Sequence, residues 1–107
     1  MATSWKAILK VIHSNGSIET LEPKGKDGKA TLDQLQESVG GLIQQFPCTT
    51  PNGVKLWVNE EGVRLKLPYN HKASLLTHST LFGPLVVEDN RKKNRPEGGW
   101  FNEETTL

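Results

Sequence analysis

Thr31-Leu-Asp-Gln-Leu-Gln-Glu-Ser-Val-Gly-Gly-Leu-Ile-Gln-Gln-Phe46 is the stretch in which the start, the apolar face and the end of a helix follow one another in order. Thr31 is a candidate N-cap, and Gln34 follows at the spacing of a capping box. Gly40 and Gly41 end the pattern, because glycine adopts the left-handed C-terminal conformation at little steric cost. The sequence therefore predicts a short helix between Thr31 and the glycine pair.

The apolar residues of this helix define the face that it buries. Leu32, Leu35 and Val39 recur at the helical period and predict one narrow apolar stripe. Such a stripe suits a helix that lies on a flat surface, and residues 42–46 can leave the helix as a strand. The stretch thus predicts a helix packed on a β-sheet.

Strand patterns surround the helix on both sides. Residues 5–12 and 17–21 are rich in strand formers and flank Asn15-Gly16, which favours a tight antiparallel hairpin. Residues 23–29 carry turn formers and charges without an apolar side chain, so we expect a solvated connector. The N-terminal part of the chain is therefore predicted as a hairpin followed by a loop.

The C-terminal half continues with further extended segments. Residues 54–59 alternate apolar and polar side chains, which predicts a half-buried strand. Residues 63–67 alternate again after Gly62 and are predicted as the return strand of a second hairpin or as a short extended piece. Residues 69–80 have no clean period and are predicted as a long ordered loop, with one helical turn at residues 72–76 as an alternative for its centre. Residues 85–88 are predicted as a buried strand.

These elements define an α+β fold with a single mostly antiparallel β-sheet and one main helix packed on one face. The 107 residues suit one domain with one core. We expect residues 89–99, which are polar and rich in breakers, to form a mobile basic excursion. Trp100 and Phe101 follow it and are expected to dock on the body of the domain.

Composition narrows the classes of protein. No apolar run approaches the roughly 20 residues of a membrane helix, and the first residues lack the apolar stretch of a secretory signal. We therefore expect a cytoplasmic protein without a membrane partner. The single Cys48 cannot form an intramolecular disulfide, and the formal net charge of +1 does not indicate a generally nucleic-acid-binding surface.

Four motifs together carry a resemblance to a known family. They are the Thr31 to Ile43 stretch, Asn59-Glu-Glu-Gly62, Leu67-Pro-Tyr-Asn70 and Gly83-Pro-Leu-Val-Val87. In order and spacing this set resembles domain of unknown function 3846, a family of small proteins common in phages and mobile elements. The resemblance implies a compact α+β domain and a phage or mobile-element origin, with no stated activity.

Residues 68–72 are the preferred contact surface. Tyr69, Asn70, His71 and Lys72 place a ring, an amide, an imidazole and an ammonium on consecutive positions, groups that suit a base, a ribose hydroxyl or a phosphate. The alternative is an ordered connector in which Asn70 caps the following turn with its own side chain.

Asn59 and Glu61 are the second pair of candidate ligand-binding residues. Their side chains can accept hydrogen bonds from a ligand, whereas the structural alternative is a hairpin turn that ends at Gly62. Either role explains why these polar residues interrupt two apolar alternations.

Signatures of catalysis and of metal binding are missing from the sequence. His71 and His78 are seven residues apart, unlike the four-residue spacing of helical zinc sites, and no Gly-x-Ser-x-Gly elbow is present. We expect no catalytic residues, no metal and no cofactor. The basic residues 91–95 stand beside acidic neighbours without interleaved aromatic residues, so nucleic acid is not an expected partner.

Three functions of different classes remain open. The first is a non-enzymatic phage-type protein that captures a small nucleotide-like ligand, such as a host defence signal, at a homo-oligomer interface. The second is an inhibitor that binds a host protein through an exposed strand edge or through Trp100 and Phe101. The third is a small hydrolase whose active site forms between subunits.

Overall fold

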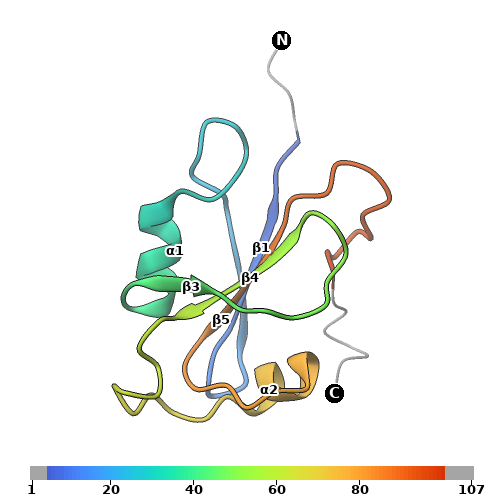
Figure 1. The fold of residues 1–107 in the computed structure, drawn as a ribbon. Helices are drawn as coiled ribbons and strands as arrows, with labels where there is room; N and C mark the ends of the chain where they lie inside the picture. The colour runs from blue at the N-terminus through green and yellow to red at the C-terminus, as the bar shows by residue number, and fades with distance from the viewer. Residues whose placement is uncertain (1–4, 101–107) are drawn as a thin grey trace.

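Within residues 5–100, the part of the chain that the computed structural model describes, five strands form one antiparallel sheet in the order β2-β1-β5-β4-β3 (Figure 1). The strands are β1 (Ile8–Ile12), β2 (Ile18–Leu21), β3 (Ile43–Gln45), β4 (Val54–Asn59) and β5 (Leu85–Asp89), and the helices are α1 (Leu32–Val39) and α2 (His71–Thr77). The predicted α+β class with a single antiparallel sheet is confirmed. No helix among these residues is both long and apolar enough to cross a membrane.

The ends of α1 follow the sequence prediction. The Thr31 hydroxyl oxygen accepts a hydrogen bond from the Gln34 backbone N–H over 3.1 Å, so Thr31 is the N-cap. At the other end, Gly40 adopts the left-handed conformation with φ of 77°, and its N–H donates to the carbonyl of Gln36. Local chemistry alone therefore sets the length of this helix.

Two details of α1 differ from the prediction. The Gln34 side chain does not complete a capping box: its Nε2 donates to the carbonyl of Glu22 and its Oε1 accepts from the N–H of Lys24. This amide is buried because it holds the connector after β2 against the helix. Leu32 is 58% exposed, so the apolar stripe consists of Leu35 and Val39 alone.

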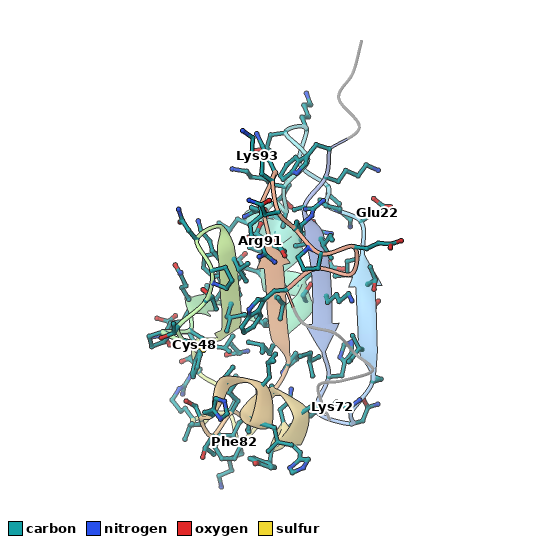
Figure 2. All side chains as sticks on the ribbon, turned by 90° about the vertical axis from the view of Figure 1, so that its right-hand side faces the viewer. Glu22, Cys48, Lys72, Phe82, Arg91 and Lys93 are labelled. Atoms are coloured by element: carbon teal, nitrogen blue, oxygen red, sulfur yellow. The ribbon has the colours of Figure 1, made fainter. Side chains whose placement is uncertain are left out.

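The two helices pack on opposite faces of the sheet. Side chains alternate between the faces along a strand. On β5, Val86 belongs to the apolar cluster that includes Val39 of α1, whereas Leu85 and Val87 belong to the cluster that includes Ala73 of α2. Figure 1 shows α1 and α2 on opposite sides of the strands, and Figure 2 shows α2 in front of them. Each fully buried Leu or Val contributes about 1.5–3 kcal/mol, so both faces stabilise the fold.

The first hairpin forms at Asn15-Gly16 as predicted. Gly16 takes a φ of 93° and donates its N–H to the carbonyl of His13, and Asn15 Oδ1 accepts from the N–H of Ser17. The hairpin sets the register in which Ile12 faces Ile18. One edge of the sheet is thereby fixed by a local turn.

The strand or short extended piece predicted at residues 63–67 is wrong, because residues 63–66 form consecutive turns. Leu65 N–H donates to the carbonyl of Glu61 and Leu67 N–H to that of Gly62, and Lys66 has a positive φ of 55°. The apolar alternation here does not mark a buried face, since Val63 is 75% exposed.

A loop throughout residues 69–80 is also wrong, because α2 occupies its centre and extends the alternative of one helical turn at residues 72–76 to residues 71–77. Asn70 is the N-cap, and its Oδ1 accepts from the N–H of Ala73. The helix buries Ala73, Ser74 and Thr77 and exposes Leu75, the reverse of a usual amphipathic pattern. The hydroxyls of Ser74 and Thr77 are satisfied by backbone carbonyls one turn earlier, which is why they can be buried.

Residues 90–99 lead away from β5 and make specific contacts with the body of the domain. Arg91 donates from Nη2 to Oδ2 of the buried Asp89 over 2.7 Å and from Nε to Oδ1 over 3.0 Å. These side-chain hydrogen bonds raise the pKa of Arg91, and the charge of Asp89 adds to the rise against the effect of burial. Arg91 is therefore not a solvated residue, and the mobility of the remaining segment stays a prediction.

The expected docking of the C-terminal aromatic pair is seen for one of its members. Trp100 is half-buried and packs against the core cluster on the α2 face, which includes Ile12 and Val54. Phe101 lies outside the described residues.

Candidate functional site

The turn after β4 is shaped by its own side chains. Asn59 Oδ1 accepts from the N–H of Glu61 over 2.8 Å, and Asn59 Nδ2 donates to the carbonyl of Val39 at the end of α1. Arg64 Nε donates to Oε2 of Glu61 over 2.8 Å, forming an ion pair at the surface. The turn therefore presents one carboxylate and one guanidinium beside each other.

The residues that flank α2 in the sequence lie beside this turn. Tyr69 and Phe82 pair as an isolated β-bridge, and their ring centroids are 6.0 Å apart in an edge-to-face arrangement. The Tyr69 and His71 rings lie 6.2 Å apart. The contacts place three aromatic rings in a row, of which Phe82 is nearest to the turn after β4.

A groove of about 550 Å³ lies between the two segments. Its lining includes carboxylates, a guanidinium and two rings, contributed by Phe46, Asn59, Glu60, Glu61, Arg64 and Phe82. An adjoining hollow of about 280 Å³ continues along Gly62, Leu67 and Phe82. The volume of the groove, about 550 Å³, falls within the range of small-molecule sites, which is about 300–1,000 Å³.

The candidate residues predicted from the sequence differ in how close they lie to the groove. Asn59 and Glu61 line the groove, and Tyr69 and His71 adjoin it through Phe82. Lys72 lies in the first turn of α2 and is half-buried. The chain thus brings the turn and the Tyr69 segment to the same region.

The two candidate asparagines also have clear structural roles. Asn70 has 0% of its surface exposed, and its Nδ2 donates to the carbonyls of Ile12 and Gly83 over 2.8 Å each. The Asn59 amide is bonded at both ends to backbone groups. Both side chains frame the groove by fixing the backbone around it, and the capping alternative for Asn70 is confirmed.

Sequence reasoning did not single out Phe46, Arg64 or Phe82 as site residues. Each stands in an unremarkable local pattern, and the groove forms through contacts between distant parts of the chain. The signal that could have found Phe82 is Leu81-Phe-Gly-Pro84, in which a large ring precedes a Gly-Pro break.

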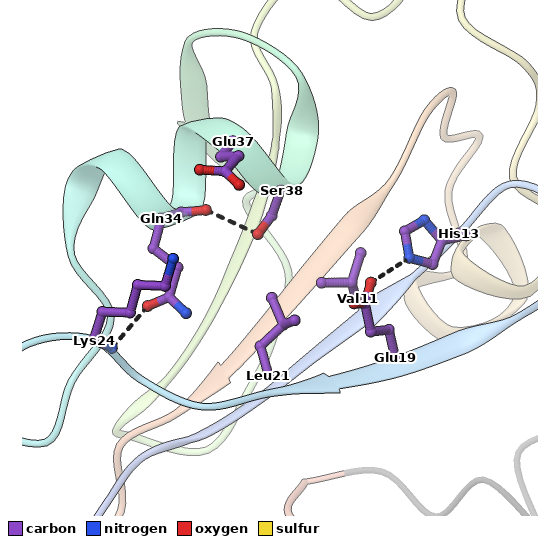
Figure 3. A pocket seen from close by; sticks show the side chains of 8 residues that line it. All are labelled: Val11, His13, Glu19, Leu21, Lys24, Gln34, Glu37 and Ser38. Carbon is purple, nitrogen blue, oxygen red and sulfur yellow. Dashed lines mark hydrogen bonds and ion pairs between the residues drawn. The ribbon is translucent and has the colours of Figure 1, made fainter.

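A smaller cleft of about 230 Å³ lies between α1 and the β1–β2 hairpin (Figure 3). Val11 and Leu21 line it, and His13 contacts Glu19 at 3.0 Å on the strand side. On the helix side, Gln34 is already bonded to the Lys24 backbone. Within residues 5–100, no three His, Cys, Asp or Glu side chains come together in an arrangement that could hold a metal ion.

The fold defines a class of small α+β domain, in which an antiparallel sheet has a helix on each face, and a hollow of about 550 Å³ lies beside one edge of the sheet. The chain belongs to the family described as Domain of unknown function (DUF3846), which matches residues 9–95. The match extends from β1 to the basic segment and includes both sides of the groove. No curated protein and no solved structure matches the chain.

Proposed function

We propose that this chain is a non-enzymatic binding protein that captures a small nucleotide-like ligand in the groove after β4. The observation that supports the proposal is the placement of Phe82 beside the Glu61–Arg64 ion pair in one hollow of about 550 Å³. A ring, a carboxylate and a guanidinium together match a heterocycle, its N–H donors and a phosphate.

The ion pair can exchange its partners at little cost. Arg64 is 72% exposed, and a surface ion pair of this kind contributes only about 0–1 kcal/mol. A ligand phosphate can therefore replace Glu61 on the guanidinium and form a bidentate contact. The released carboxylate of Glu61, with that of Glu60, can then accept hydrogen bonds from the N–H groups of the base.

The aromatic row supplies the apolar part of the site. The base packs against Phe82, whose orientation is supported by the edge-to-face contact with Tyr69. Tyr69, His71 and Lys72 remain outer contacts for the ribose or phosphate in this proposal. Asn59 and Asn70 hold the surrounding backbone.

The biological setting is part of the proposal and rests on the family resemblance. A phage or mobile-element origin would make a host defence signal the natural ligand, captured in the host cytoplasm. The short edge strand β3 contributes Gln44 to the groove, so a second copy beside this edge would enclose the ligand in a homo-oligomer.

A second candidate function is binding to a host protein. It is favoured by the exposed apolar side chains of Val63, which lines the groove, and of Leu65, and by the open edge of β3. Exposed strand edges can accept a strand from a partner. A host protein that co-purifies while no nucleotide binds would favour this candidate.

Native mass spectrometry with a mixture of linear and cyclic nucleotides tests the first proposal. We expect mass gains in whole-number steps and a loss of the gain in Phe82→Ala and Arg64→Gln. Arg64→Gln is the decisive variant, because its exposed side chain can change without disturbing the core. Leu32→Ala, an exposed change on α1, is the control.

An absence of any mass gain would overturn the proposal. Equal binding by Arg64→Gln and Leu32→Ala would also overturn the assignment of the groove. The same spectra report the oligomeric state of the protein.

A further inference from the structure

Two basic loops that are far apart in the sequence lie at the same end of the molecule. Residues 24–29 hold three lysines and one aspartate, and residues 91–97 hold four cationic residues and one glutamate. Figure 1 shows both loops beyond the same ends of the strands, and Figure 2 shows Lys93 at that end. Each loop by itself carries only a few cationic side chains, but together the two loops form one surface.

Trp5 joins the two loops. On one side, the Ala7 N–H donates to the carbonyl of Gly28 over 2.8 Å, and a Cβ on Gly28 would lie 3.0 Å from Cε3 of Trp5. On the other side, Trp5 Nε1 donates to the carbonyl of Arg91 over 3.2 Å. Lys92 Nζ lies 5.0 Å from the centre of the indole ring and Arg95 Cζ lies 5.8 Å from it, both within cation–π range.

The charge of this end differs from that of the whole chain. Formal net charge is only +1 for all 107 residues, whereas each of the two loops alone carries a larger positive excess. The remainder of the chain is therefore net negative. Such asymmetry orients a protein towards an anionic partner.

We propose that this basic end, made of Lys26, Lys29, Lys92, Lys93 and Arg95, binds the phosphate backbone of a nucleic acid. The four lysines are exposed, so they do not form a closed cage for one small anion. A polyanion neutralises several exposed cations at once and gains from the release of its counterions. The guanidinium of Arg91 is bonded to Asp89 and serves to anchor the loop.

The predicted binding is independent of base sequence. Trp5 already contacts Lys92 and Arg95, so its ring does not offer a free platform for stacking on a base. This proposal differs from the expectation for residues 91–95 alone, because the folded chain adds the lysines of residues 24–29 to the same surface. It does not depend on the groove after β4.

The test is fluorescence anisotropy with the full chain and short labelled DNA duplexes of two unrelated sequences. Five phosphate contacts, from the four lysines and Arg95, predict an affinity loss of roughly 500-fold between about 50 mM and about 200 mM salt. Lys26→Gln and Lys93→Gln each remove one exposed charge from a different loop. Each should lower the slope of log affinity against log salt by about one, and the double variant by about two.

The matched control removes one lysine beyond the opposite end of β4. Lys66→Asn places a residue that tolerates positive φ at a position with φ of 55°. The control should keep the salt slope of the parent. Absence of binding at low salt, or equal losses in the control, would overturn the proposal. Binding of polyglutamate of matched charge as tightly as DNA would assign the surface to an acidic protein and overturn the nucleic-acid assignment.

Discussion

Asn70 Nδ2 donates a hydrogen bond to the carbonyl oxygen of Ile12 over 2.8 Å, across 58 residues of sequence. The same nitrogen donates to the carbonyl of Gly83, and Oδ1 caps α2. One buried side chain therefore ties the end of β1, the start of α2 and the approach to β5.

Asn70→Ala is expected to destabilise the fold strongly. The change removes a helix cap worth about 1 kcal/mol and takes a hydrogen-bond partner from two carbonyls, each costing about 1 kcal/mol or more when buried. We expect a total near 3 kcal/mol and a fall in Tm of at least about 10 °C by thermal unfolding. The exposed neighbour His71→Ala should change stability by less than about 0.5 kcal/mol. Similar Tm values for the two variants would contradict the role of Asn70.

Gly40 and Gly41 are expected to differ in how they end α1. A Cβ on Gly40 meets nothing within 4 Å, so Gly40→Ala should cost only the strain of its φ of 77°, about 1 kcal/mol. A Cβ on Gly41 would lie 3.0 Å from Asn59 Nδ2, which is bonded to Val39. Gly41→Val should therefore cost more than Gly40→Ala in urea unfolding, and the opposite order would show that Asn59 is not held there.

Arg91→Ala is expected to leave a buried carboxylate without its ion-pair partner. Asp89 has 1% of its side chain exposed, and breaking a buried pair costs about 3 kcal/mol or more. Because the pKa of Arg91 is raised in the folded chain, its ion pair contributes fully to stability at every pH below the pKa that Arg91 has in the unfolded chain. This contribution is lost only as the pH rises through the raised pKa, far above neutrality. Urea unfolding should thus give the same loss at about pH 6 and about pH 9. Lys93→Ala is the control, and an equally small effect of both changes would contradict the prediction.

Gly62→Ala is expected to weaken the proposed ligand binding. A Cβ at Gly62 would lie 2.9 Å from the carbonyl oxygen of Phe82, so the two sides of the groove must move apart. A Cβ on Gly98 would lie at an ordinary 3.6 Å from Lys10 Nζ, so Gly98→Ala is the control. In titration calorimetry with the nucleotide identified by mass spectrometry, unchanged affinity in Gly62→Ala would show that the ligand lies elsewhere.

The elements predicted correctly are those whose signals are local. Thr31 and Gly40 cap α1 through bonds within a few residues, and Asn15-Gly16 closes its hairpin through its own turn. Such signals depend only on residues that are close in the sequence, so they can be recognised before the rest of the fold is known.

The elements predicted wrongly depend on distant contacts. The sequence of α2 has no helical apolar period, because the buried face includes Ser74 and Thr77 while Leu75 is exposed. The two buried hydroxyls are bonded to backbone carbonyls one turn earlier. Residues 63–67 alternate like a strand, but bonds back to Glu61 and Gly62 turn them into a compact loop. For the candidate site, the sequence indicated Glu61 but not Phe82, whose position in the groove depends on tertiary packing.

The position of β5 has a consequence for synthesis on the ribosome. This strand lies at the centre of the sheet, between β1 and β4, yet it follows the four other described strands in sequence. The hairpin of β1 with β2 and the pair of β3 with β4 can form early, but neither has its central neighbour until residues 85–89 leave the exit tunnel. The nascent chain therefore exposes two open strand edges until late in translation, and the final joining of its halves is a non-local and correspondingly slow step.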